Sequence, residues 1–156
     1  MLVFEPAFQK ALELVKSLEG FSATVYNDVA GIPTIGYGHV LRKNERYDTI
    51  TQAQALDLLT QDLRPAFWVV VGTPRPMCKA LNSDQLAALA SLVFNIGAAA
   101  YESSSLYACL QAGNDSEVPK QFMRWCKAKV NGVKVVVKGL QNRRQKELAV
   151  YQTFQF

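Results

Sequence analysis

The chain has 156 residues, 49% of them hydrophobic, which is enough for one compact domain with a core and too few for two independent domains. No stretch approaches the roughly 20 consecutive apolar residues of a membrane-spanning helix, and no basic segment followed by an apolar run opens the chain. We therefore predict a single domain that folds in the cytoplasm and does not insert into a membrane.

The net charge of +4 is unevenly distributed along the chain. Residues 120–156 contain nine Lys or Arg and one Glu, a balance of +8, which leaves −4 for residues 1–119. A basic segment of this kind favours an anionic partner. The basic residues match no nucleic-acid-binding module, and a cell wall rich in carboxylates and phosphates fits as well as nucleic acid.

The three cysteines, Cys78, Cys109 and Cys126, are widely spaced, and the chain has a single histidine. This combination gives no zinc-binding pattern. We expect free thiols that are mostly buried.

The first predicted element is a helix that ends at Glu19-Gly20, because glycine is the usual residue after a helix. Pro6 stands near its start, and apolar residues follow at helical spacing: Ala7, Phe8, Ala11, Leu12, Val15 and Leu18. Glu19 would then lie at the negative end of the helix dipole. That position disfavours the carboxylate form, which suits a general acid.

Residues 24–39 change to short β-prone runs around a turn with Asp28, Gly31 and Pro33, which predicts a hairpin. Asp28 is expected on the first strand and the Thr34 hydroxyl on the returning strand. Glu19 and Asp28 could then face each other across a cleft. Two opposed carboxyl groups are the minimum for cutting a glycosidic bond, since one protonates the leaving oxygen and the other handles water or developing charge.

The remaining predicted elements are helices. Thr51–Gln54 is a capping box that opens one helix, and Asn82–Asp84 caps an apolar helix that stops at Gly97. Further helices are expected over residues 104–113, 116–127 and 140–151. The break after Lys127 is too short for a domain linker, and there are no internal repeats.

The chain resembles the phage-type lysozymes, the muramidase endolysins of tailed bacteriophages, over essentially its whole length. Four collinear blocks carry the resemblance, which makes coincidence unlikely. They are Glu19-Gly20 with Asp28 and Thr34-Ile-Gly-Tyr-Gly-His39; Thr51 with Gln61-Asp62-Leu63; Leu92-Val-Phe-Asn-Ile-Gly97; and Gln121-Phe-Met-Arg-Trp-Cys126 with Gly139-Leu-Gln-Asn-Arg-Arg144 and Glu147.

The resemblance implies an α+β, mostly α, lysozyme-like fold in one domain over residues 1–156. A small β-hairpin lobe would span residues 20–50, and residues 1–19 and 51–156 would form a larger helical lobe, with the active cleft between the lobes. The implied reaction is hydrolysis of the β-1,4 bond between N-acetylmuramic acid and N-acetylglucosamine, with no metal or cofactor. Glu19 would be the general acid, and Asp28 and Thr34 would hold water, an inverting arrangement with carboxyl groups roughly 6.5 to 9.5 Å apart.

The resemblance also implies supporting and substrate-binding residues. Arg143 would pair with the catalytic Glu, and His39 with Asp62 in a structural ion pair. Sugar contacts are implied for Val40, Phe94 and Ser105, although Phe94 sits on an apolar face and fits a core position equally well. Trp125 is expected in the core, and Pro119 stands where relatives often have a polar cleft residue.

Peptidoglycan is the implied partner, and we expect a monomer. The lack of an N-terminal signal-anchor implies the soluble subtype, held in the host cytoplasm until a separate holin releases it to the periplasm and cell wall. Two alternatives stay open: a wall-binding module with an inactive site, and a lytic transglycosylase, which needs the acid but no water-holding partner.

Overall fold

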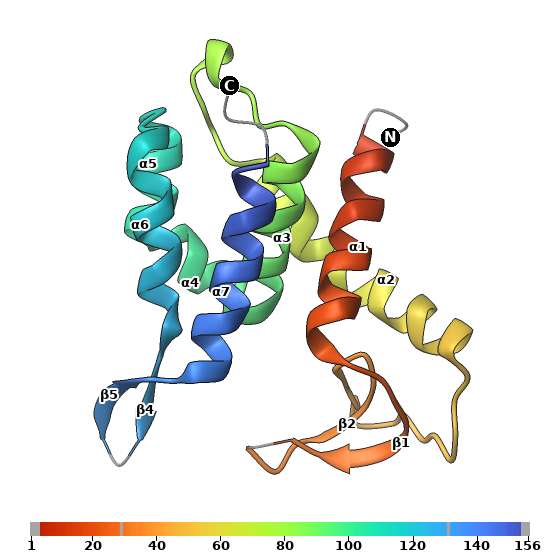
Figure 1. Cartoon of the computed structure of the whole chain (residues 1–156). Helices are drawn as coiled ribbons and strands as arrows, with labels where there is room; N and C mark the ends of the chain where they lie inside the picture. Colours follow the sequence, from red (N-terminus) through yellow and green to blue (C-terminus); the bar gives the residue numbers. More distant parts are fainter. Residues whose placement is uncertain (1–3, 29, 131, 154–156) are drawn as a thin grey trace.

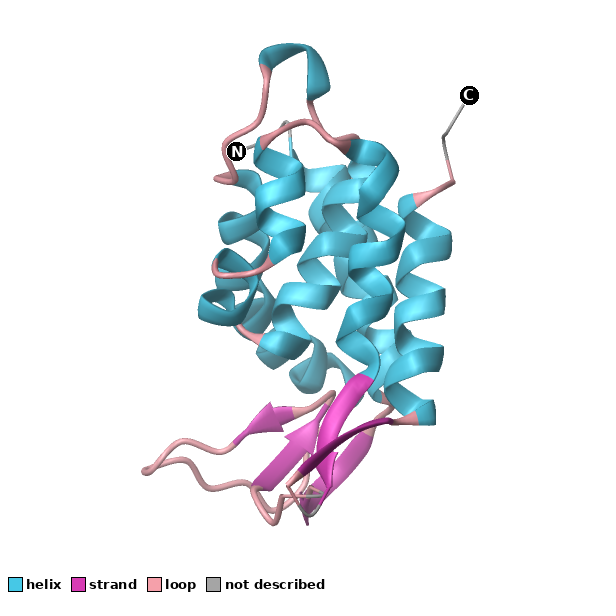
Figure 2. Cartoon of the chain, turned by 90° about the vertical axis from the view of Figure 1, so that its left-hand side faces the viewer, coloured by secondary structure: helices cyan, strands magenta, loops and turns pink. Residues whose placement is uncertain are grey.

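The computed structural model describes residues 4–28, 30–130 and 132–153. The chain is mostly helical, with two small antiparallel sheets at one end of the helical part (Figures 1 and 2). This confirms the predicted mostly-α fold of the α+β class. The elements are α1 (Glu5–Glu19), β1 (Ser22–Asn27), β2 (Pro33–Gly36), β3 (His39–Val40), α2 (Gln52–Val71), α3 (Ser83–Ile96), α4 (Ala98–Glu102), α5 (Ser105–Gln111), α6 (Val118–Met123), β4 (Lys127–Val130), β5 (Val133–Val136) and α7 (Lys138–Tyr151).

Helix α3 is the centre of the helical part. It packs against α1, α2 and α7, and every residue from Leu86 to Val93 is buried. A helix that is apolar on all sides is stable only when neighbours surround it, which explains its central position. The predicted capping box of Thr51 and Gln54 opens α2, and the predicted cap at Asn82 opens α3, where it forms a capping box with Gln85.

The sheet formed by β1, β2 and β3 lies beneath α1 and packs on α2. Gly36 has φ +65°, and a β-carbon there would come within 3.0 Å of the β-carbon of Ala55. Asp28 is not on the first strand as predicted, because β1 ends at Asn27. The Asp28 side chain accepts hydrogen bonds from the backbone N–H groups of Ala30 and Ile32, and this turn ends the strand pairing.

The predicted helical segment over residues 116–127 is confirmed only in part, because its α-helical portion is limited to Val118–Met123. The segment consists of a 3₁₀ turn (Asp115–Glu117), the short helix α6 and a second 3₁₀ turn (Arg124–Cys126). Pro119 suits the first turn of a helix, and Trp125 has φ −90° and ψ 30°, outside the helical region, so α6 cannot extend through it.

A second hairpin, β4–β5, occupies the segment after Lys127, where the sequence predicts only a break between helices. Gly132, at φ +83°, lies between its strands, while Asn131 lies outside the described residues. Lys127 pairs with Val136, and Lys129 with Lys134, so these four residues share one face of the hairpin. The short helix α4 is likewise absent from the sequence-based prediction.

The three cysteines are free, as expected. Cys126 is buried and Cys109 half-buried, but Cys78 is exposed, because it lies on a 3₁₀ turn (Met77–Lys79) that contributes no residue to the core. Among the described helices, none is both long and apolar enough to cross a membrane.

Candidate active site

Glu19 is the last residue of α1, and Gly20 ends the helix with φ +71°. Nη1 of Arg143, on α7, donates a hydrogen bond to Oε1 of Glu19 over 2.5 Å. The exposed fractions of the two side chains are 22% for Glu19 and 10% for Arg143. Helices α1 and α7 therefore meet at this carboxyl group, and one of its two oxygens is fixed.

The second oxygen of Glu19 faces Gly38, between β2 and β3. A β-carbon at position 38 would lie 3.1 Å from Oε2 of Glu19, and Gly38 has φ +83°. Only glycine combines this backbone conformation with room for the carboxyl group.

Asp28 is held by its turn. Its Oδ1 accepts the N–H groups of Ala30 and Ile32 over 2.8 and 2.9 Å, whereas no described residue donates a hydrogen bond to Oδ2. One carboxyl oxygen is thus used to hold the turn, and the other is available to a ligand.

A cavity of about 410 Å³ brings the two predicted carboxyl groups together. Its lining combines acidic, apolar and amide side chains: Glu19, Asp28, Gly38, Val40, Asp62, Phe94 and Asn95. Of the implied sugar contacts, Val40 and Phe94 lie here. Sequence reasoning missed Gly38 and Asn95 as cavity residues, although both stand inside the sequence blocks that carry the resemblance.

Thr34 does not line this cavity in the described part of the chain. It is 3% exposed, and its hydroxyl donates to the carbonyl of Ile32 over 2.9 Å. Tyr26 lies opposite Thr34 in the strand register. Burial, and then the negative charges of Glu19 and Asp28, raise the pKa of Tyr26. Sequence reasoning did not single out this residue.

Ser105 lies elsewhere. It lines a second cavity, of about 280 Å³, with Ser104, Arg124, Trp125, Lys127 and Lys134. Its hydroxyl donates to Oε1 of Gln121 over 2.6 Å and accepts from Nη1 of Arg124 over 3.1 Å. Trp125 is partly buried against the core, as expected, and borders this cavity as well.

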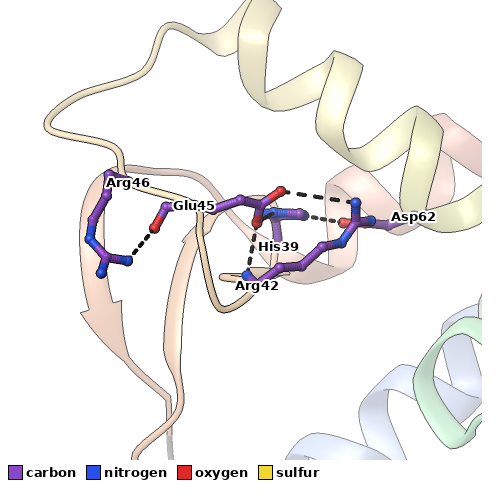
Figure 3. A network of polar contacts seen from close by, with 5 residues as sticks. All are labelled: His39, Arg42, Glu45, Arg46 and Asp62. Atoms are coloured by element: carbon purple, nitrogen blue, oxygen red, sulfur yellow. Dashed lines mark hydrogen bonds and ion pairs between the residues drawn. The ribbon is translucent and has the colours of Figure 1, made fainter.

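His39, on β3, is 3% exposed and lies between two carboxylates (Figure 3). Its Nδ1 is 2.6 Å from Oδ2 of Asp62, on α2, and its Nε2 is 2.9 Å from Oε2 of Glu45. The backbone N–H of Arg42 also donates to Glu45. Burial acts to lower the pKa of His39, but the hydrogen bonds and charges of Asp62 and Glu45 outweigh it and raise the pKa above 6.5. The network joins the hairpin to α2.

The Asp62 partner agrees with the resemblance, whereas Glu45 was missed. It stands in a polar loop that offers no sequence pattern. The guanidinium of Arg46 donates to the backbone carbonyl of Glu45, which further fixes this loop (Figure 3).

A family model described as phage lysozyme matches residues 16–147 of the chain. The chain belongs to the phage lysozyme family. The chain is 39% identical over 146 residues to the endolysin of Acyrthosiphon pisum secondary endosymbiont phage 1, covering 93% of the present chain and 97% of that protein. It is 36% identical over 145 residues to the endolysin of Bacillus phage PZA, of which it spans only 54% while 92% of the present chain is covered.

Solved structures agree with this assignment. The endolysin from Escherichia coli O157:H7 phage FAHEc1 superimposes on the chain with a TM-score of 0.83 and 32% identity, over 92% of the present chain and 90% of that one. The muramidase domain of SpmX from Asticaccaulis excentricus gives 0.80 and 31%, over 90% and 93%. The family resemblance inferred from the four sequence blocks is thereby confirmed.

Proposed function

We propose that this phage lysozyme hydrolyses the β-1,4 bond between N-acetylmuramic acid and N-acetylglucosamine in peptidoglycan and so lyses the host cell wall. The observation that carries the proposal is that Glu19 and Asp28 line one cavity. Membership of the phage lysozyme family and the endolysin relatives support peptidoglycan cleavage at host lysis. The name of the SpmX muramidase domain supports the choice of bond.

Glu19 is the proposed general acid. Its carboxyl group delivers a proton to the leaving glycosidic oxygen while Arg143 fixes its orientation through Oε1. Because Gly38 has no side chain, Oε2 is not blocked from that side.

Asp28 is the proposed base that positions and activates water. Its Oδ1 accepts hydrogen bonds within the turn, so Oδ2 is the oxygen proposed to hold the water. Thr34 bonds the carbonyl of Ile32, whose own N–H holds Asp28, so in this geometry Thr34 supports Asp28 through the turn. Direct contact of Thr34 with the water requires rotation of its hydroxyl group.

Sugar rings are proposed to contact Val40, Phe94 and the amide of Asn95 along the cavity wall. Ser105 belongs to a more basic part of the surface, with Arg124, Lys127 and Lys134. This part suits the anionic groups of the same polymer. Release by a separate holin and action as a monomer remain predictions.

Mass spectrometry of the muropeptides that the pure protein releases from purified peptidoglycan tests the proposal. Products with a reducing N-acetylmuramic acid end are expected, and Glu19→Gln should release none while melting like the parent. Products with an anhydro sugar would assign a lytic transglycosylase instead. Wall binding by the parent without any product would assign a binding module.

A further inference from the structure

A buried cluster of charged side chains lies directly behind Glu19. Glu147, on α7, is 0% exposed, and its Oε1 accepts hydrogen bonds from Ser91 Oγ over 2.7 Å, Arg144 Nη2 over 2.9 Å and Arg143 Nε over 3.1 Å. A carboxylate without access to water is unfavourable unless it is paired and hydrogen-bonded. These donors and the two guanidinium charges together compensate for the burial of the carboxylate.

Arg143 is shared between two carboxyl groups. Its Nε faces Glu147 and its Nη1 faces Glu19, while Nη2 is buried without a hydrogen-bond partner among the described residues. A guanidinium is planar and rigid, so fixing one edge also fixes the direction of the other. Glu147 thus determines where the positive charge of Arg143 is held relative to Glu19.

Arg144 connects the same cluster to the cavity at a second point. It is 0% exposed, its Nε lies 2.7 Å from Oε2 of Glu147, and its Nη2 donates to Oδ1 of Asn95, which lines the cavity. Burial raises the pKa of Glu147, and the charges of Arg144 and Arg143 and the hydrogen bond from Ser91 act against this. Two guanidiniums and one carboxylate therefore form a unit that ends at Glu19.

Arg143 is the guanidinium of this unit that contacts Glu19, whereas Arg144 contacts Asn95 and Glu147. A general acid must carry a proton, so the charge held beside it matters for its function. We propose that Glu147 is a positioning residue that holds Arg143 against Glu19 and offsets part of the positive charge that Glu19 would otherwise experience. The inference rests on the proposed role of Glu19.

The competing explanation is purely structural, since Glu147 also joins α7 to α3 through Ser91. The two explanations differ in what a charge change does to the titration of Glu19. Other titratable groups near the unit are Tyr26 and Asp28 beside Glu19, Asp62 on the cavity wall, and Cys126 near Arg144. None of them is altered in the test.

The test compares Glu147→Gln with the matched control Ser91→Ala, which removes a hydrogen bond from the same carboxylate without changing a charge. Carboxyl NMR titration of Glu19, the pH dependence of peptidoglycan cleavage and thermal melting are measured for each variant. In Glu147→Gln the titration midpoint of Glu19 should move down, because a neighbouring negative charge is lost while the positive charge of Arg143 remains on α7. The alkaline limb of the cleavage rate should move with it. Ser91→Ala should melt earlier and leave the midpoint unchanged.

An unmoved Glu19 midpoint in folded Glu147→Gln overturns the inference. If that variant does not melt cooperatively, Glu147→Asp replaces it. The aspartate side chain is one carbon shorter, so a smaller shift of the Glu19 midpoint in the same direction is expected. An unchanged midpoint in this variant would again overturn the inference. If the titration midpoint of Glu19 moves while the pH dependence of cleavage does not, the inference about Glu147 is supported but Glu19 is not the general acid. This outcome distinguishes failure of the proposed function from failure of the inference.

Discussion

Gly38 and Glu19 are in van der Waals proximity, so that a β-carbon at position 38 would lie 3.1 Å from Oε2 and 3.4 Å from the carboxyl carbon of Glu19. The two residues come from different elements, a turn of the small sheet and the end of α1. Their contact sets how closely the hairpin approaches the proposed acid.

Gly38→Ala should lose most of its lytic activity, roughly 10-fold or more, because the new methyl group pushes the Glu19 carboxyl group away from its position beside Arg143. The matched control is Gly132→Ala, since Gly132 has the same φ of +83° but no atom within 4 Å of the place that a β-carbon would occupy. Both variants should lose about 1 kcal/mol of stability from backbone strain. Turbidity assays and thermal melts measure the two effects, and equal activity losses would contradict the steric explanation.

Asp28→Asn should preserve the turn but sharply reduce catalysis. An amide oxygen can accept the N–H groups of Ala30 and Ile32 as Oδ1 does, but an amide cannot act as a base. We expect lysis to fall roughly 100-fold or more with little change in melting temperature. Asp28→Ala should lose activity and also loosen the turn. Lysis by Asp28→Asn near the parent rate would remove Asp28 from the mechanism.

The His39–Asp62 contact should make stability depend on pH. Since the folded-state pKa of His39 is raised, its contribution is fully present below the unfolded value of about 6.5 and is lost as pH rises through the folded value. Asp62→Asn should therefore cost about 2 kcal/mol at about pH 5.5 and less at about pH 9, measured by denaturant unfolding. Asp57→Asn, an exposed change on the same helix, is the control and should show no such difference. A loss independent of pH would argue against a charged pair.

The hairpin lysines should contribute unequally to wall binding. Lys129 and Lys134 are paired across the strands, but only Lys134 borders the cavity with Ser105 and Trp125. Lys134→Gln should weaken binding to peptidoglycan and reduce its salt dependence more than Lys129→Gln, although both remove one charge. Sedimentation with purified walls between about 0.1 M and 1 M salt, where the Debye length falls from about 10 to 3 Å, measures this. Identical effects would mean that overall charge, not this cavity, is responsible.

The sequence predicts best where a structure depends on nearby residues. The helix end at Gly20 and the helix caps at Thr51 and Asn82 are local patterns, and all three appear in the structure. The β4–β5 hairpin was missed because its strands are largely exposed and lack the alternation of a half-buried sheet. A strand that contributes nothing to the core does not need apolar residues at regular spacing, so no such spacing marks it in the sequence.

Parts of the site depend on contacts between distant residues, and these a single sequence does not reveal. The separate cavity of Ser105 and the fully buried Glu147 follow from how elements pack. Spacing within one segment identified Glu19 and Asp28 as a pair, whereas the residues behind Glu19 come from α3 and α7.

The Arg143–Glu19 contact spans 124 residues of sequence. During synthesis, a chain that has not yet produced α7 contains Glu19, Asp28 and the whole small sheet but lacks the guanidinium that orients the acid. Glu19 and Asp28 are synthesised before α7, so Arg143 can contact Glu19 only after that helix has been made. A partly synthesised chain without α7 would therefore contain both proposed catalytic carboxyl groups but lack the guanidinium that orients Glu19.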